Sequence, residues 1–399
     1  MTHPETTTWR FILRPLDRVQ FGEERDRDQQ DYLVRSRPWP QQTALLGLLR
    51  YELLRRNGLL LDPGSYWEAG VKANVVDPLI GPGSFTGQES ESFGAIREVG
   101  PLAVLLEADE VLLYPCIDPG EGTAKPSTTK ALASHGGKVQ DASHFPGFDA
   151  KLHEAGRLVL SSLDGRHRMP LFDDGDQGHA VAHGRNRMAP EGGLLICFTV
   201  PGVTKDRDGI QSDAEREGHF YVTESHRMRS GYAYTFTATL AGHPLKEGPG
   251  WKEPQVVRFG SDGHPWLLVG KPLDNAARDP GEDPNLLLLS DARVDAKVLD
   301  LCQAVVGDVT HFRNQRKRTE HRFRHHATHS VLNDREEATF GLHGALLLQR
   351  GTVLWPREGR SDDVRELLDE RQAWRTIGCN HYRCFRELTD LTPNTTNRP

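Results

Sequence analysis

Residues 40–56 read PQQTALLGLLRYELLRR, in which a proline and two glutamines lead directly into an aliphatic segment that ends in arginines. Proline disfavours helix at the residue before it, so the helix is expected to begin at Gln41 or Gln42. The leucines recur at helical spacing, and Asn57 with the following glycine supplies a stop signal. A polar start, and Arg50 in the middle of so apolar a helix, need a further explanation.

Strand patterns surround this helix on both sides in the sequence. The clearest is YAYTFTATL at 232–240, where large apolar residues alternate strictly with small polar ones. Other strands are expected at 9–15, 102–106, 111–114, 192–200, 256–260, 265–270 and 285–290, with a hairpin at 344–356 that turns at Gln349-Arg350-Gly351. Further helices are expected at 295–306 and 362–374. Strands and single helices recur without a regular β-α-β-α alternation, which favours duplicated α+β sandwiches over a doubly wound sheet.

A chain of 399 residues is longer than one hydrophobic core usually fills, so two domains are expected. We divide the chain into residues 1–200 and 201–399. Residues 120–188 are poor in apolar side chains and rich in Gly, His and Asp, and we interpret them as an insertion in the first domain. The segment KLHEAGRLVLSSL is the best helical or packed piece of that insertion.

Composition excludes several classes of protein. The formal net charge of −7 argues against coating of nucleic acid by the overall field, although a basic block runs from His311 to His326. No apolar run approaches a membrane span and the N-terminus has no apolar signal core, so a cytoplasmic protein is expected. The 5 cysteines show no CxxC pair, and GxSxG, P-loop and dinucleotide motifs are absent, so we expect no cofactor.

Seven segments, taken in order, resemble one family. They are FILRPLDRVQFG, WPQQTALLGLLRYELL, GAIREVGPL with VLLYPCIDP, GHFYVTESHRMRSGYAYTF, VVRFGSDGHPWLLVG, LLLQRGTVLWP and IGCNHY. Together they are similar to the RAMP-superfamily subunit of type III-B CRISPR effector complexes (the Cmr module) that holds the 5′ end of the guide RNA. The related type III-A subunit and variant type III assemblies share this pattern. Members of the family commonly have a paired-glycine turn where this chain has Gly260-Ser261-Asp262-Gly263.

The resemblance implies a fold, a function and partners. The fold would be two packed ferredoxin-like (RRM-like) domains with insertions. The function would be non-catalytic, namely binding and capping the 5′ tag of the crRNA in an antiviral defence complex. The partners would be the crRNA, the large polymerase-palm subunit, the filament-forming backbone subunit and, indirectly, target RNA.

The start of the first helix offers the groups that such RNA binding needs. Single-stranded RNA of fixed sequence is bound by amides and hydroxyls at base edges, guanidinium groups at phosphates and flat side chains for stacking. Gln41, Gln42 and Thr43 present the first kind at a helix start, whose free N–H groups also attract phosphate, and Arg50 is a candidate cation. The alternative is that Gln42 or Thr43 only caps the helix and that Arg50 lies on its solvated face.

Two other groups of candidate RNA-binding residues lie later in the chain. His226, Arg227 and Arg229 follow the strand FYVTES and precede a glycine turn, where basic side chains can meet phosphates. The alternative is an arginine-rich surface hairpin. In the second group, Gly378 permits a close backbone approach to phosphate beside Asn380 and His381, or simply forms a turn.

The basic block supplies the last candidates, Arg316, Lys317 and Arg318, which would track an RNA backbone or dock an acidic neighbouring subunit. If the block is helical, His321, His325 and His329 share one face at a spacing compatible with metal ligands. No cysteine or carboxylate completes that set nearby in the sequence, so we predict no metal site.

The sequence is also compatible with two other functions. One is a metal-independent endoribonuclease of the same superfamily that processes CRISPR repeat RNA, with a histidine acting as general acid or base toward a 2′-hydroxyl. None of the 18 histidines sits with a Tyr, Ser or Lys partner at a recognisable spacing. The other is a structural adaptor that contacts only protein.

Overall fold

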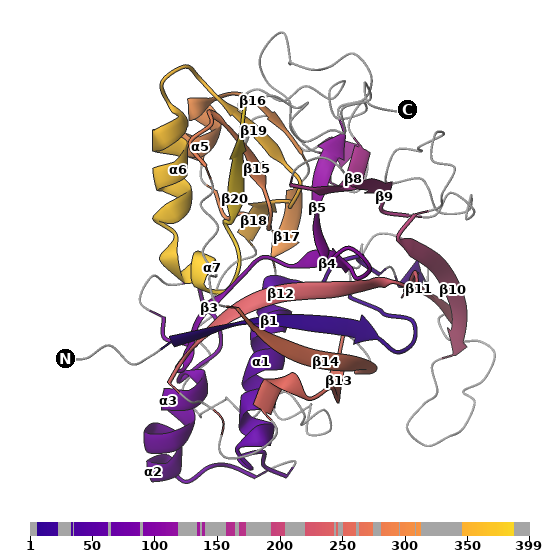
Figure 1. The fold of residues 1–399 in the computed structure, drawn as a ribbon, viewed down its shortest axis with the longest axis vertical. Coiled ribbons are helices and arrows are strands. Elements are labelled where there is room, and N and C mark those ends of the chain that lie inside the picture. Colours follow the sequence, from indigo (N-terminus) through magenta and orange to yellow (C-terminus); the bar gives the residue numbers. More distant parts are fainter. Residues whose placement is uncertain are drawn as a thin grey trace.

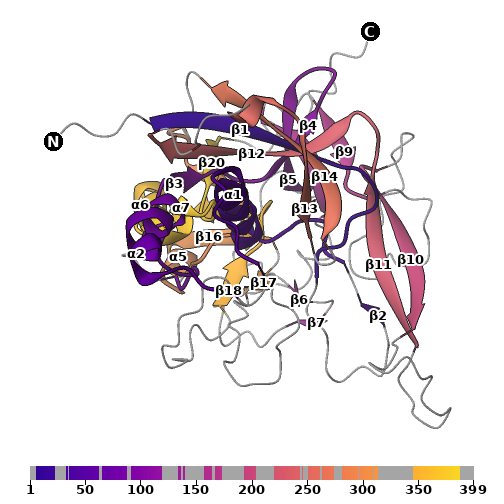
Figure 2. The same ribbon diagram turned by 90° about the horizontal axis from the view of Figure 1, so that it is seen from below.

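The computed structural model shows an α+β protein with a large antiparallel sheet (Figures 1 and 2). The structure describes residues 6–22, 33–34, 36–62, 65–87, 91–118, 134–135, 138–139, 157–163, 167–172, 193–203, 220–242, 245, 250–260, 263–273, 281–294, 296–307, 309–312 and 345–386. No helix among these residues combines the length and the apolar character that a membrane crossing requires.

The large sheet has nine strands, and all its neighbouring strands pair antiparallel. Its order is β13 (Gln255–Phe259), β14 (His264–Leu273), β1 (Thr6–Pro15), β12 (Tyr232–Ala241), β4 (Ala103–Leu106), β5 (Val111–Asp118), β8 (Arg157–Ser162) and β9 (Arg168–Pro170), with β3 (Ile96–Val99) also paired to β12. Because β1 and β4 both run antiparallel to β12, they are parallel to each other. The connection between them carries the helix α1 (Gln42–Arg56).

A second sheet of four antiparallel strands is built from the last third of the chain. Its order is β16 (Cys302–Val306), β19 (Val353–Pro356), β15 (Asn285–Leu288) and β20 (Tyr382–Phe385). The helix α5 (Ala296–Leu301) joins β15 to β16, and α6 (Ser361–Asp369) with α7 (Gln372–Thr376) joins β19 to β20. Figure 1 shows these helices on one side of the four strands.

Smaller elements complete the described chain. The strands β10 (Leu195–Val203), β11 (Phe220–Met228) and β2 (Leu33–Val34) form a three-stranded sheet. The strands β17 (Val309–Phe312) and β18 (Ala345–Leu348) form one pair, and β6 (Ser134–His135) and β7 (Lys138–Val139) form another. Short helical segments lie at α2 (Ala69–Val71), η1 (Lys72–Val76), α3 (Asp77–Ile80) and η3 (Gly250–Lys252).

The helix α1 begins and ends where its sequence signals are. It starts at Gln42 and ends at Arg56, as predicted, and Asn57 closes it by donating from Nδ2 to the carbonyl of Leu53 at 2.8 Å. Glu52 is fully buried in the last two turns, where Arg55 and Arg56 contact its carboxylate at 2.7 and 3.4 Å. These pairings compensate a buried charge that an apolar helix would otherwise not tolerate.

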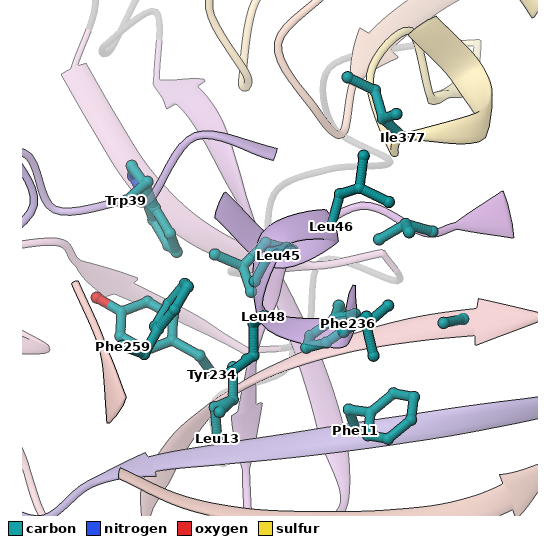
Figure 3. Close-up of a cluster of buried hydrophobic side chains, with 14 of the residues drawn as sticks. Phe11, Leu13, Trp39, Leu45, Leu46, Leu48, Tyr234, Phe236, Phe259 and Ile377 are labelled. Carbon is teal, nitrogen blue, oxygen red and sulfur yellow. The ribbon is translucent and has the colours of Figure 1, made fainter. Parts of the chain in front are cut away.

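Leucines of α1 fill the space between the large sheet and the segment that follows α7. Leu45, Leu49 and Leu53 are fully buried in the main core together with Phe11 and Leu13 of β1. Figure 3 shows Leu48 on the side of Leu13, whereas Leu46 points toward Ile377, the residue that follows α7. The helix is therefore covered on two sides, which explains why its apolar residues are not confined to one stripe.

Several sequence-based expectations needed correction. Residues 295–306 were expected to be one helix, but the helix stops at Leu301 and the rest is strand β16. The turn at 349–351 is confirmed, yet β18 and β19 pair with other strands and form no hairpin with each other. Residues 157–162 of the predicted insertion form β8, which extends the large sheet from β5.

In the chain, the last strand of the large sheet ends at Leu273 and the first strand of the four-stranded sheet begins at Asn285. Residue 200, where the sequence suggested a boundary, lies inside β10, and β12 and β14 from beyond it pair with β1 on either side. Both antiparallel partners of β1 come from segments more than two hundred residues later in the chain, so the large sheet spans the boundary suggested by the sequence.

The Tyr234 hydroxyl provides a first test of this core. Its ring is 1% exposed and lies against Trp39 and Trp266, and its hydroxyl donates to the carbonyl of Pro38 at 2.6 Å. Tyr234→Phe removes this hydrogen bond and is expected to lower the free energy of unfolding by about 1 kcal/mol in urea titration. The matched change Tyr51→Phe, at a ring that is 44% exposed, should leave the midpoint unchanged. Equal midpoints for the two variants would contradict the expectation.

Candidate functional site

The first turn of α1 has no side-chain cap in the described part of the chain. Gln41 is the N-cap residue, with extended dihedrals of φ −65° and ψ 149°, and its side chain makes no capping hydrogen bond. The first turn also contains no acidic residue. Gln41 and Thr43 are both partly exposed. The positive end of the helix dipole is therefore compensated by no carboxylate of its own first turn, an arrangement that favours a bound anion.

Gln42 links this helix start to the far end of the chain. Its side chain is 2% exposed, and Nε2 donates to the carbonyl of Gly378 at 2.8 Å. The amide oxygen, Oε1, is buried and finds no hydrogen-bond partner within the described ranges of the chain. Gln42 thus positions the start of α1 against the turn that follows α7, and in this structure its amide faces protein instead of solvent.

The turn at Gly378 fits only a residue without a side chain. Gly378 has φ +94°, and a Cβ built on it would lie 2.8 Å from the carbonyl oxygen of Gly100 and 2.9 Å from that of Val99. Both contacts are to backbone atoms at the end of β3 and just after it, which cannot swing away as a flexible side chain would. Three segments that are distant in sequence therefore meet here: the start of α1, the end of β3 and the turn after α7.

Asn380 and His381 are engaged by the protein itself. Asn380 is fully buried with φ +58°; its Oδ1 accepts from the amide of Arg293 at 2.7 Å, and its Nδ2 donates to the carbonyls of Arg293 and Leu368 at 3.1 and 3.2 Å. The His381 ring lies 3.3 Å from the carbonyl of Arg375 through Nε2. Burial, and then the nearby Arg375 guanidinium, lower the pKa of His381 to about 4. His381 is therefore neutral at pH 7 and offers no positive charge to a phosphate.

Arg50 lies inside the protein and not on a solvated face of α1. It is 6% exposed, and its guanidinium lies 5.4 Å from the ring centroid of Phe93. Among the described residues, Nε and Nη2 have no hydrogen-bond partner. Burial lowers the pKa of Arg50 to about 10, against the opposing attraction of Glu91, so the side chain still carries its charge at neutral pH. This charge, carried by a residue of α1 itself, is enclosed beneath the surface.

The candidates on β11 and just after it have three different environments. His226 is 1% exposed, so it is a core residue and not the surface cation that its position before a turn had suggested. Arg227 is exposed, and Arg229 is partly exposed. The strand extends through Met228, so alternate residues point to opposite faces and separate His226 from Arg227.

The structure does not bring all the predicted RNA-binding residues together in one site. Gln42 and Gly378 are in contact, with Asn380 and His381 in the same turn. The group at β11 is separate: both views place α7 toward the left of the molecule and β11 at its right (Figures 1 and 2). The basic residues Arg316, Lys317 and Arg318 and the histidines 321, 325 and 329 lie outside the described residues.

Sequence reasoning missed the cluster around Arg350. This side chain is 1% exposed and forms an ion pair with Asp291, with Nη2 and Oδ2 3.1 Å apart. Its guanidinium also lies 5.6 Å from the ring centroid of Trp39, which belongs to the core of the large sheet. The only sequence signal near Arg350 was the predicted turn at 349–351. That signal was misleading, because an arginine in a turn normally faces solvent. Arg350 instead joins the segment after β15 to the segment before α1.

Comparisons with known proteins gave matches among solved structures alone. No protein-family model matches the chain. No curated protein matches it either. A chain of the cryo-EM structure of the type III-B Cmr-beta bound to cognate target RNA and AMPPnP is similar over 96% of this chain and 98% of its own length, at 12% identity and a TM-score of 0.47. A chain of the Cmr-beta structure bound to cognate target RNA is similar over 94% and 96%, at 12% identity and a TM-score of 0.43.

Proposed function

We propose that this chain is a non-catalytic subunit of a type III CRISPR effector complex that holds the 5′ tag of the crRNA. The order of the seven family-like segments in the sequence supports the proposal. The contact between two of those segments, 336 residues apart, carries it: Gln42 from WPQQTALLGLLRYELL donates to Gly378 of IGCNHY. This hydrogen bond places a family-like segment from the start of the chain and one from its end in a single structural unit.

The order of strands supports two ferredoxin-like domains. In the second sheet the elements follow the chain as β15, α5, β16, β19, α6 with α7, and β20, and the spatial order is fourth, first, third, second. In the large sheet, β14, β1, β12 and β4 stand in the same spatial order, with α1 in the first connection. This split β-α-β arrangement is the ferredoxin-like pattern. The first domain would then comprise strands up to Leu273, with β5, β8 and β9 added at its edge.

The uncapped start of α1 is the proposed phosphate contact. Its first-turn N–H groups and the partly exposed Gln41 and Thr43 supply backbone and side-chain donors at a positive helix end. Gln42 acts as a positioning residue through Gly378, and Arg50 adds an enclosed positive charge two turns further along the helix. Arg227 on β11 would contact a separate part of the RNA or a neighbouring subunit.

Exposed apolar side chains support assembly with other subunits. Tyr66, Val71 and Val75 are 77%, 37% and 42% exposed, and the two valines lie in the α2–η1 segment. Phe198 on β10 and Val222 on β11 are 39% and 36% exposed. Phe198 and Val222 point to opposite faces of the β10–β11 ladder, whereas Val71 and Val75 are four residues apart in one helical segment. Neighbouring exposed apolar residues of this kind are typical of surfaces that contact another protein. We expect the large subunit and the backbone subunit to cover them.

Gln41 offers a test in which stability and RNA binding move in opposite directions. Gln41→Asp adds a capping carboxylate and is expected to raise the free energy of unfolding by about 1 kcal/mol. The same negative charge should repel phosphate and lower the amount of crRNA retained by the purified complex several-fold. Both quantities can be measured on one preparation, by urea unfolding of the chain and by quantifying RNA in the assembled complex.

The control is Gln41→Asn, which caps the helix without adding charge. It should stabilise the chain as Gln41→Asp does but lower crRNA retention much less, because it occupies a first-turn N–H group without repelling phosphate. If Gln41→Asp retains as much crRNA as Gln41→Asn, the start of α1 is not a phosphate contact.

The wider assignment is tested by purifying the assembled complex from the native host and sequencing the bound small RNA. Guides that share one 5′ tag, protected from nuclease by this subunit, are the expected result. Incubating the purified chain with labelled repeat RNA separates the other functions: cleavage would establish the endoribonuclease, and complexes without any RNA contact to this subunit would establish the adaptor.

A further inference from the structure

Three side chains with metal-binding atoms lie together on one face of the β10–β11 ladder. Cys197 on β10 stands directly opposite His226 on β11 in the antiparallel register, and Glu224 precedes His226 by two residues. Residues two apart in a strand point to the same face, so the register brings all three side chains together. Their ligand atoms all lie within 4.8 Å of one another.

His226 is held rigidly at the inner side of this cluster. It is 1% exposed, and its backbone exchanges hydrogen bonds with Val19 in both directions, at 2.9 and 2.7 Å. Its ring lies 5.5 Å from that of Phe172, and its Nε2 is 3.4 Å from Oε1 of Glu224. Among the described residues, Nδ1 is buried and has no hydrogen-bond partner. A buried polar atom without a partner is costly, which points to a further ligand in this cluster.

Glu224 is also oriented by a neighbouring segment. The amide of Ser36 donates to its Oε1 at 3.4 Å, and the hydroxyl of Ser36 in turn accepts from the amide of Phe21 at 3.1 Å. Hydrogen bonds of this kind fix the orientation of metal-binding carboxylates in known sites. Cys197 and Glu224 are partly exposed, so the cluster opens toward solvent on the side away from His226.

We propose that Cys197, Glu224 and His226 form a Zn²⁺ site with one further position open to water. A thiolate, an imidazole and a carboxylate together suit zinc, whereas Mg²⁺ and Ca²⁺ prefer oxygen ligands and Cu(I) prefers sulfur. Tetrahedral zinc with these ligands requires ligand atoms about 3.5 Å apart, so rotamer adjustments of roughly 1 Å complete the site. The metal would tie the β10–β11 ladder to the segment around Ser36, independently of any RNA contact at α1.

Cobalt substitution tests the site on the purified full-length chain. The chain is first stripped with a chelator and then titrated with Co²⁺, whose thiolate charge-transfer absorption reports a Co–S bond directly. Wild type is expected to bind one equivalent with this absorption, and Zn²⁺ should displace the cobalt. Cys197→Ser should abolish the absorption and weaken Zn²⁺ binding by about 100-fold or more, since even outer partners of a metal site contribute 10- to 100-fold.

Cys302→Ser is the matched control, because Cys302 lies in the four-stranded sheet, away from β10 and β11. It should keep both the absorption and the Zn²⁺ affinity. Glu224→Gln tests the site without altering the thiol: it should retain the fold, judged by circular dichroism, and lose most of the thermal stabilisation that Zn²⁺ gives wild type. A Co–S absorption that survives Cys197→Ser, or equal Zn²⁺ affinity in wild type and both ligand variants, would overturn the proposal. Retention of crRNA is a separate measurement and is expected to be the same with and without Zn²⁺.

Discussion

Replacing Gly378 with alanine is expected to lower the free energy of unfolding by about 3–4 kcal/mol. Two costs add. Alanine at φ +94° adopts a left-handed conformation that costs about 1–2 kcal/mol, and its Cβ would meet two backbone carbonyl oxygens at less than 3.0 Å. Relief of those contacts requires the turn to move away from the end of β3, which also breaks the hydrogen bond from Gln42.

Gly359→Ala separates the two costs. Gly359 has φ +71°, but a Cβ added there meets no atom of the described residues within 4 Å. Its loss of stability should therefore be limited to the conformational cost of about 1–2 kcal/mol. Urea unfolding of both variants gives the comparison. Equal losses would show that the close approach at Gly378 contributes nothing, and the meeting of the three segments would then be loose.

A second large effect is expected at the buried ion pair between Arg350 and Asp291. Asp291→Asn leaves the enclosed guanidinium without its counter-charge, and Arg350→Met leaves the carboxylate without its cation. Each single change is expected to lower the free energy of unfolding by about 3–5 kcal/mol. The double variant should lose less than the sum, because it leaves no uncompensated charge. Strict additivity in this double-mutant cycle would contradict a direct interaction.

The ion pair also predicts a dependence on pH. Burial raises the pKa of Asp291, but attraction to Arg350 and hydrogen bonds from it outweigh burial, so the pKa lies below its ordinary value. The stabilisation is therefore fully present above the ordinary aspartate pKa of about 3.9, and it is lost as the pH falls through the lowered value in the folded protein. Wild type should lose stability over that acidic range, and Asp291→Asn should lose less.

A surface pair provides the comparison for both measurements. Lys271 and Glu110 lie 3.2 Å apart, with side chains 56% and 69% exposed. Lys271→Met is expected to change the free energy of unfolding by no more than about 0.5 kcal/mol, because solvent and salt screen exposed pairs. The large contrast with Arg350 follows from burial and not from the length of the contact, which is similar in the two pairs.

Much of the local structure followed from the sequence. The bounds of α1, β4 and β12 agree closely with the periodicity and the stop signals, since these elements have strong apolar patterns and clear flanking residues. Strand β1 begins earlier than predicted, at Thr6, and β5 runs past the predicted end to Asp118. Where a short apolar run lacked such signals, the sequence was misleading. The run that begins at Cys302 has a helix-compatible pattern, yet pairing with β19 makes it a strand.

The candidate site was less predictable because it depends on contacts between distant segments. The sequence identified Gln42 and Gly378 separately, but it gave no sign that one hydrogen-bonds to the other. It placed Arg50 and His226 at the surface, whereas both are buried by elements that lie far away in the chain. Charged residues in an amphipathic pattern are normally solvated, so their enclosure is visible only once the neighbouring elements are in position.

The sequence by itself determined the α+β class, the position of the first long helix and the positions of most strands, because these depend on periodicity and on neighbouring residues. The tertiary structure alone decided the partners: which strands flank β1, which turn receives Gln42, which carboxylate pairs with Arg350 and which face gathers Cys197, Glu224 and His226. The physical reason is that antiparallel pairing and side-chain packing join residues across hundreds of positions, and no local pattern encodes which segments will meet.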